Sequence, residues 1–205
     1  MRRWIIVLGF LMLATAPGRA RAALLGDAAV AYSAERTVVI NGRTYTGTVF
    51  HIPGRDRDEQ EIEGVAEVII LDAAAKQGFL FLPMLKTYVT FAFPPLLAEL
   101  DNPALRRSPM GQEVVNGVRT TKYRVDHVAA DGSRARGFIW VSARGVLMRL
   151  DGTVTRAHGG RPMQLSMELA NLAIGPQDPG LFQLPAGLIK LPSDMLQALL
   201  SGKPG

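Results

Sequence analysis

The amino-acid sequence predicts a mainly β protein whose largest element is an antiparallel sheet. Runs rich in β-branched and aromatic residues recur along the chain, separated by turn dipeptides, and give roughly nine or ten short strands. Most of these runs alternate apolar with polar residues, as strands with one dry face do. No long helical segment separates them, which excludes parallel crossovers. We expect the sheet to roll into a barrel, pair with a second sheet or be covered by helices.

The first strands are predicted around a hairpin. Residues 37–40 and 43–50 are rich in β-branched and aromatic residues, and Asn41-Gly42 separates them. Asn-Gly is a strong hairpin signal because both residues tolerate positive φ. Residues 55–63 are densely charged and form either a loop or a solvent-facing strand, and residues 65–71 are predicted to be a strand.

The most apolar stretch beyond the N-terminal leader runs from Gly78 to Leu100. It predicts a strand, a turn marked by proline, a second strand and a short helix opened by Pro94-Pro95. Both faces of these strands are largely apolar. One face can therefore pack on a core, while the other needs either a covering helix or an apolar guest.

The second half of the chain predicts another hairpin, with Asn116-Gly117 between residues 113–115 and 118–128. Before this hairpin, residues 101–110 are expected to be irregular. After it, strands are predicted at 135–142, at 146–155 and from Met163 to Ala170, where apolar and polar residues alternate. Ser193 to Ser201 is predicted to be a helix because its leucines and methionine recur at helical spacing.

The N-terminus is typical of a secretory signal peptide. Arg2 and Arg3 precede the apolar run from Trp4 to Ala16, and Ala20-Arg21-Ala22 offers small residues for cleavage after Ala22. The alternative is a membrane anchor, but the run is shorter than the roughly 20 residues that span a bilayer. We therefore expect four regions: a signal peptide (1–22), an N-terminal arm (23–31), a curved-sheet domain (32–191), and a C-terminal helix and tail (192–205).

Charge and cysteine content narrow the class of protein. Residues 1–22 hold four Arg and no acidic residue, so the remaining chain keeps 19 of the 23 basic residues against 18 acidic ones, a net charge of +1. That balance gives no argument for binding nucleic acid. The chain has no Cys, which excludes disulfides and a lipidated N-terminus. Export without disulfides favours a bacterial periplasm.

Two motifs resemble the LolA-type lipoprotein-carrier superfamily. The first is the turn from Asp72 followed by Phe79 to Pro83, Lys86 and Tyr88, and the second is the closing stretch Asp178 to Gly187. The resemblance covers most of residues 32–191. It implies a strongly curved, antiparallel half-barrel sheet with short helices covering its concave face, in a periplasmic protein. In the closing stretch it implies an acidic residue that begins a turn and a Phe that plugs the sheet.

The resemblance also points to a lipid-binding cavity. Carriers usually have an Arg-Pro pair and a nearby aromatic in an early strand, whereas this chain has Arg55 and Arg57 there without the Pro or the aromatic, so we expect a divergent member. These two arginines are candidate contacts for an anionic headgroup, or else part of a solvated charged loop. The candidate cavity lining, for which plain core is the alternative, is Phe79, Phe81, Tyr88, Phe91, Phe93, Leu96, Leu97, Trp140, Met148, Met163 and Met167.

Few residues favour catalysis or a metal site. His51, His127 and His158 lie far apart and show no zinc-ligand spacing. His158-Gly159-Gly160 has no accompanying Gly-x-Ser-x-Gly that would supply a nucleophile. We therefore expect no catalytic residue, no metal and no cofactor.

The sequence thus favours a non-enzymatic periplasmic carrier or binding protein. Its partners are expected to be a lipid or an acylated protein held in the apolar hollow of the sheet, together with a protein of the inner or outer membrane. Nucleic acid is not expected, and the protein is expected to be a monomer. The alternative is a structural or interaction protein whose core is filled by its own side chains, and a hydrolase with an unrecognised site ranks third.

Overall fold

The structure is a computed structural model, which describes residues 28–92, 107–129, 132–157 and 161–192. The expected signal peptide and the expected helices at 95–100 and 193–201 lie outside the described residues. Within the described ranges no helix has the length and apolar character needed to cross a membrane.

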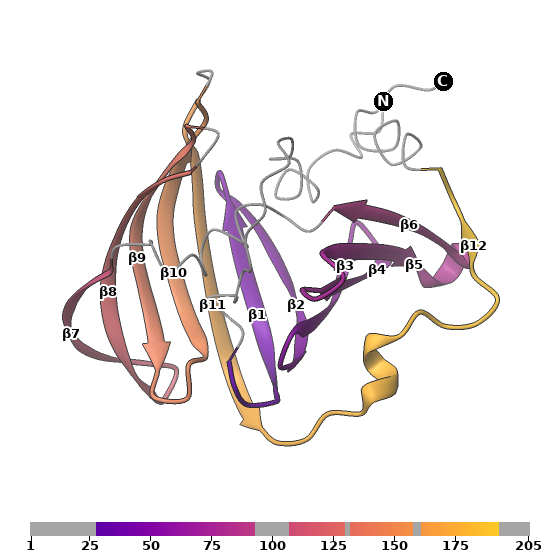
Figure 1. The fold of residues 1–205 in the computed structure, drawn as a ribbon, viewed down its shortest axis with the longest axis horizontal. Helices are drawn as coiled ribbons and strands as arrows, with labels where there is room; N and C mark the ends of the chain where they lie inside the picture. The colour runs from indigo at the N-terminus through magenta and orange to yellow at the C-terminus, as the bar shows by residue number, and fades with distance from the viewer. Residues whose placement is uncertain (1–27, 93–106, 130–131, 158–160, 193–205) are drawn as a thin grey trace.

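The described strands form one open, curved sheet (Figure 1). Their order across it is β12-β6-β5-β4-β3-β2-β1-β11-β10-β9-β8-β7, and only β12 and β6 pair in parallel. This confirms the mainly β, antiparallel prediction, while the covering helices are not among the described elements. The strands are β1 (Tyr32–Ile40), β2 (Arg43–Ile52), β3 (Arg55–Ile62), β4 (Val65–Asp72), β5 (Gln77–Leu82), β6 (Thr87–Ala92), β7 (Arg107–Val115), β8 (Val118–Val128), β9 (Arg134–Ser142), β10 (Leu147–Thr155), β11 (Met163–Ile174) and β12 (Ile189–Lys190).

Both predicted Asn-Gly hairpins are confirmed. Asn41 and Gly42 have φ of 49° and 80°, and Asn116 and Gly117 have 45° and 78°. Two consecutive residues at positive φ match the right-handed twist of the flanking strands. Two short 3-10 helices complete the elements, η2 (Pro83–Leu85) at the expected proline turn and η3 (Pro179–Phe182) in the closing stretch.

The charged run at 55–63 is a strand and not a loop. β3 pairs with β2 on one side and β4 on the other, and its Asp58 and Gln60 are only 6% and 8% exposed. The expectation of an irregular segment up to residue 110 is wrong at its end, because β7 begins at Arg107 and pairs with β8.

The strand register divides the side chains between two faces, because residues opposite one another in neighbouring strands point to the same side. One face, which we name the inner face, carries Tyr123, Ile139, Leu150, Met167 and Val38. The opposite outer face carries Lys122, Trp140, Arg149 and Glu168.

The described core is divided into four clusters rather than gathered in one. One cluster lies on the inner face of β8–β10 around Val125, Ile139 and Leu147, and another on the inner face of β5 and β6 around Leu80 and Val89. A third lies on the outer face of β4 and β5, and the fourth joins the segment before β1 to the β9–β10 region. Apolar side chains are therefore buried on both faces of the sheet.

Candidate functional site

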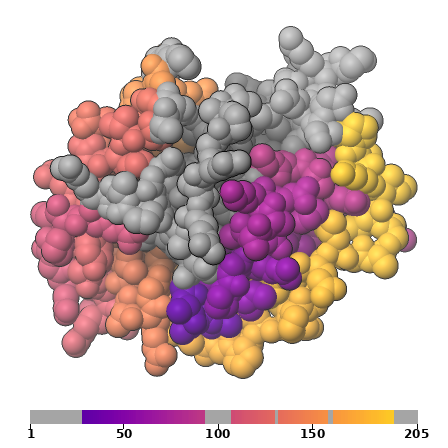
Figure 2. Space-filling model, in the orientation of Figure 1, coloured from indigo at the N-terminus to yellow at the C-terminus, as the bar shows by residue number. Residues whose placement is uncertain are grey.

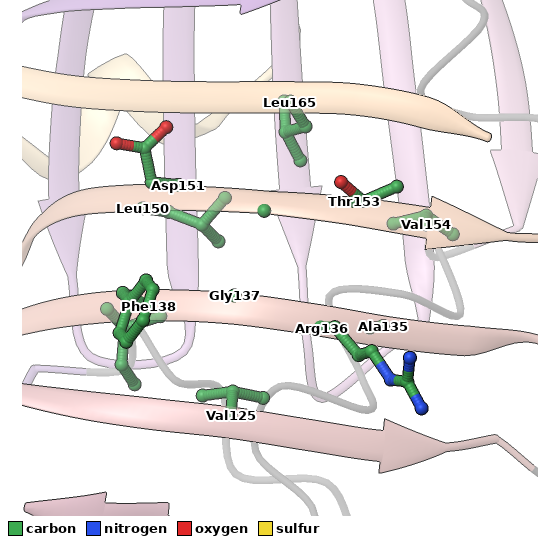
Figure 3. A pocket seen from close by; sticks show the side chains of 12 residues that line it. Val125, Ala135, Arg136, Gly137, Phe138, Leu150, Asp151, Thr153, Val154 and Leu165 are labelled. Carbon is green, nitrogen blue, oxygen red and sulfur yellow. The ribbon is translucent and has the colours of Figure 1, made fainter.

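An apolar hollow opens on the inner face of strands β8 to β11 (Figure 3). The space over it that no atom fills is about 430 Å³, a figure that includes open solvent, so the hollow is a shallow surface depression and not an enclosed cavity. Its inner-face lining is Val125, Ala135, Gly137, Ile139, Leu150, Gly152, Val154 and Leu165. In the close view, Leu165 and Val125 flank it from β11 and β8, with Leu150 between them.

Two glycines create the hollow. Gly137 of β9 lies opposite Gly152 of β10, so the inner face has no side chain at either position. A Cβ on Gly137 would collide with the carbonyl oxygen of Asp151, and one on Gly152 would lie 2.8 Å from that of Arg136. Glycine inside a strand marks such close backbone approach. The local strand packing therefore requires both glycines and leaves the space above them empty of side chains.

A polar strip crosses the same inner face on β1, β3 and β4. It consists of Arg36, Asp58, Gln60 and Glu67, which the register places on the inner side. The Arg36 guanidinium lies 2.8 Å from Oδ1 of Asp58, which makes an ion pair, although this oxygen has no well-directed hydrogen bond. The Gln60 amide donates to Glu67 across a long 3.5 Å. We name these four residues the inner polar strip.

Burial dominates the electrostatics of the inner polar strip. It raises the pKa of Asp58, and the nearby Arg36 opposes this effect only in part. Burial likewise raises the pKa of Glu67, against the lowering effect of the hydrogen bond from Gln60. Both carboxylates are thus poorly solvated. A cationic or hydrogen-bond-donating group placed beside them would stabilise their charged forms.

The structure does not bring the predicted apolar set together. Phe91, Met163 and Met167 lie on the inner face, where the Phe91 ring covers Gly78. The aromatics Phe79, Phe81, Tyr88 and Trp140 lie on the outer face. Met148, fully buried, lies beside a register shift in β10, and Phe93, Leu96 and Leu97 lie outside the described residues. Met163 and Met167 pair with Val154 and Leu150, two residues that line the hollow.

The chain's own C-terminal segment covers the outer face of β4–β6. Leu184 and Leu188 pack on the cluster that contains Phe81, and Phe182 is only 5% exposed. Asp178 begins η3 by accepting a hydrogen bond from the Gly180 N–H at 2.8 Å. The expected capping turn is therefore confirmed, and Phe182, expected to plug the sheet, is buried. In the space-filling view the yellow C-terminal residues lie against the purple and magenta strands (Figure 2).

Arg55 and Arg57, the candidate headgroup contacts, lie on the outer face with partners from this chain. Arg55 Nε is 3.0 Å from Oδ2 of Asp72. Arg57 donates to Glu59 at 2.6 Å and to the Leu181 carbonyl at 2.8 Å, and its guanidinium lies 5.5 Å from the centre of the Phe81 ring. Arg57 thus attaches η3 to the sheet.

Neither the hollow nor the inner polar strip was predicted from the sequence, although both leave a signal there. Gly137 and Gly152 each interrupt a strand pattern, which indicates close backbone approach. Ala34 and Val38 lie two residues either side of Arg36, and Ile62 lies two residues after Gln60, so alternation places these two polar side chains on a face that also carries apolar ones. Asp58, between Asp56 and Gln60, carries no such signal.

The described histidines hold structural positions. His51 is fully buried, with Nδ1 2.8 Å from Asp56 and Nε2 2.9 Å from the Ala28 carbonyl oxygen, and it stacks on Tyr32. Burial raises the pKa of the Tyr32 hydroxyl. His127 lies on β8, and His158 lies outside the described residues. Among the residues that the structure describes, no three metal-ligating side chains come together.

Comparison with solved structures shows what the chain is similar to. MucB in complex with MucA(peri) matches at a TM-score of 0.50 and 13% identity, over 81% of this chain. The chain spans 58% of the length of that MucB chain. An uncharacterised conserved protein from Thermus thermophilus matches at a TM-score of 0.52 and 9% identity, over 80% of this chain and 91% of that one.

A LolA superfamily protein, NE2245 from Nitrosomonas europaea, also matches, at a TM-score of 0.43 and 7% identity over 80% of this chain and 94% of that one. No protein-family model and no curated protein sequence matches the chain. At these identities the matches speak for the fold alone. At that level, MucB and the Thermus protein show that this chain shares their fold. The resemblance to the LolA-type superfamily rests on the two sequence motifs.

Proposed function

We propose that this protein is a non-enzymatic periplasmic carrier that holds the acyl chain of a lipid or of a lipidated partner in the inner-face hollow. The observation that carries the proposal is the apolar hollow over Gly137 and Gly152, which no described side chain fills. Each methylene buried there would contribute about 0.8 kcal/mol. Burial of apolar area in the hollow would therefore supply part of the binding energy of an acyl chain.

The inner polar strip suggests how the ligand lies. Leu165 at the hollow pairs with Ile40 of β1, and Arg36 lies four residues further along that strand. At about 3.3 Å per residue, the two positions are roughly 13 Å apart. A chain seated in the hollow can thus place its polar end beside Arg36 and Asp58. The raised pKa of Asp58 and of Glu67 favours a polar end that donates hydrogen bonds, such as an amine or a hydroxyl.

Of the predicted cavity residues, Met163 and Met167 are placed to extend the apolar surface beside the hollow, whereas Phe91 lies on the inner face of β6, several strands away. Phe79, Phe81, Tyr88 and Trp140 lie on the other face and would contribute to stability instead. The proposal keeps the expected regions, with a cleaved signal peptide at 1–22 and the sheet domain at 32–191. A protein so exported meets lipids and lipoproteins in the envelope.

The test compares one substitution on each face of the sheet. Leu150→Glu places a charge in the hollow, whereas Gln164→Glu places the same charge on the outer face. The protein is purified from the periplasm of a bacterial host, its organic extract is examined by mass spectrometry, and binding of a fluorescent fatty-acid analogue is measured. Circular dichroism and thermal melting check that both variants fold.

We expect lipid in the extract of the wild-type protein and of Gln164→Glu, and at least tenfold weaker dye binding in Leu150→Glu, because a buried charge without a partner is costly. An empty wild-type protein that binds the dye no better than Leu150→Glu would overturn the carrier proposal. The interaction-protein alternative would then stand. It is favoured by the MucB match, since that protein was solved in complex with MucA.

A further inference from the structure

Three of the seven large apolar side chains that are exposed in the described residues gather at one edge of the sheet. Met84 and Leu85 of η2 are 76% and 63% exposed, and Ile189 of β12 is 64% exposed. The Ile189 N–H donates to the Lys86 carbonyl at 2.8 Å, which fixes β12 beside the η2 turn. We name Met84, Leu85, Lys86, Ile189 and Lys190 the β5–β6 tip.

Lysines accompany the apolar side chains at this tip. Lys86 directly follows η2 with φ of 50°, and Lys190 follows Ile189, and both residues are exposed. The neighbouring β3–β4 turn carries Glu63, so the local charge is mixed and the apolar side chains must supply most of any binding energy. Lysine stems can lie along apolar surface while their ammonium groups remain in water.

This combination fits the interfacial region of a bilayer. Apolar side chains that project from a tight turn can enter the boundary between headgroups and acyl chains, while adjacent lysines meet anionic headgroups. A protein partner is the less favoured occupant. Stable protein interfaces bury at least about 1,200 Å² in total, which three side chains on a projecting turn do not provide.

We propose that the β5–β6 tip docks this protein reversibly on an anionic lipid surface. This inference does not rest on ligand binding in the hollow, which lies on β8–β11, several strands away across the sheet. If both proposals hold, the tip brings the sheet to a membrane surface, where the hollow takes up or releases a lipid.

The experiment measures co-sedimentation of the purified periplasmic protein with phosphatidylcholine vesicles that contain phosphatidylglycerol. Met84→Asp/Leu85→Asp removes the apolar side chains of the tip. Met110→Asp/Val114→Asp is the matched control, because these residues are 56% and 69% exposed on β7, at the opposite edge of the sheet (Figure 1). Lys86→Glu/Lys190→Glu tests the contribution of the two lysine charges to vesicle binding. Leu150→Glu changes the hollow and leaves the tip intact, so it shows whether vesicle binding depends on the hollow.

We expect the tip variant to bind at least tenfold more weakly than the wild type, while the β7 control stays within twofold. The affinity of the lysine variant for anionic vesicles should fall about fivefold per lysine, and its affinity for pure phosphatidylcholine vesicles should change little. Leu150→Glu should bind vesicles normally even where it no longer binds the dye. Equal losses of vesicle binding in the tip and β7 variants would overturn the proposal. A wild-type protein that binds neither kind of vesicle would also overturn it, and a protein would then be the remaining candidate partner for the tip.

Discussion

The two halves of the sheet bury their apolar side chains in opposite ways. On β4–β6 the outer face is covered by the C-terminal segment, whose Leu184 and Leu188 pack on the Phe81 cluster and whose Phe182 is buried. On β8–β10 the outer face is charged: Lys122 and Arg149 lie 4.8 and 4.7 Å from the centre of the Trp140 ring. The inner face of these strands carries a separate apolar cluster and the hollow.

This difference shows that an apolar sequence does not by itself mark a binding site. The stretch from Gly78 onward has apolar residues on both faces, but its outer face packs under a distant part of the same chain. The hollow lies instead where alternation is regular and two glycines remove side chains. Substitutions in these two regions should therefore have different consequences.

The covered half should depend strongly on Phe182. Replacing it with Ala removes the buried ring of η3, so we expect a loss of about 3–5 kcal/mol in the free energy of unfolding. Gln183→Ala, at the exposed neighbouring position, should change it by less than about 0.5 kcal/mol. Urea denaturation measures both, and equal losses would show that the segment does not hold the outer face.

Carboxylates on the two faces should respond to pH with opposite signs. Burial raises the pKa of inner-face Asp58 above its ordinary 3.8, so the folded state binds the proton more tightly and stability falls as pH rises through that window. Hydrogen bonding from Arg134 lowers the pKa of outer-face Asp126, so its contribution is present above 3.8 and is lost as pH falls through the folded pKa.

The measurement is the free energy of unfolding of Asp58→Asn and of Asp126→Asn, each relative to the wild type, between pH 3 and pH 7. As pH rises, Asp58→Asn should become more stable relative to the wild type, because the wild type loses stability. Asp126→Asn should become less stable relative to the wild type, because the wild type gains stability. Slopes of the same sign at both positions would contradict the assignment of these carboxylates to different environments.

The smallest expected effect concerns Trp140. Its Nε1–H donates to Glu113 at 2.6 Å, and Lys122 binds the same carboxylate at 3.0 Å. In Glu113→Ala the indole N–H resonance should move upfield and exchange faster with solvent, because its acceptor is lost. Glu168→Ala, also on the outer face but paired with Arg149, should leave that resonance in place. An unchanged resonance in Glu113→Ala would show that this hydrogen bond is absent in solution.

Local sequence signals predicted most of the sheet. Both Asn-Gly hairpins, the η2 turn and the buried Phe182 follow from turn chemistry and short motifs. Whether an aromatic side chain faces a cavity depends on the register between neighbouring strands. No local pattern in the sequence shows that Phe79 and Phe91 lie on opposite faces of one hairpin. The C-terminal segment covers the outer face through contacts between residues far apart in the sequence, such as the hydrogen bond from Arg57 to the Leu181 carbonyl.

The hollow itself was not predicted, because what forms it is missing side chains. Gly137 and Gly152 become informative only once the register places them opposite each other. Likewise, Arg36 and Asp58 form a pair only because β2 brings β1 and β3 together on either side of it. Pairing across strands is therefore the information that sequence patterns lacked.

The central claim is that an acyl chain binds on the inner face of β8–β11. Because the chain has no Cys, single-cysteine variants can report on each face without background. Leu150→Cys and Gln164→Cys are labelled with a maleimide in the presence and absence of a palmitoyl lysophospholipid below its micelle concentration. We predict that the lipid slows labelling at position 150 at least fivefold and leaves position 164 unchanged. Equal labelling with and without lipid at position 150, or protection at position 164 alone, would contradict the account.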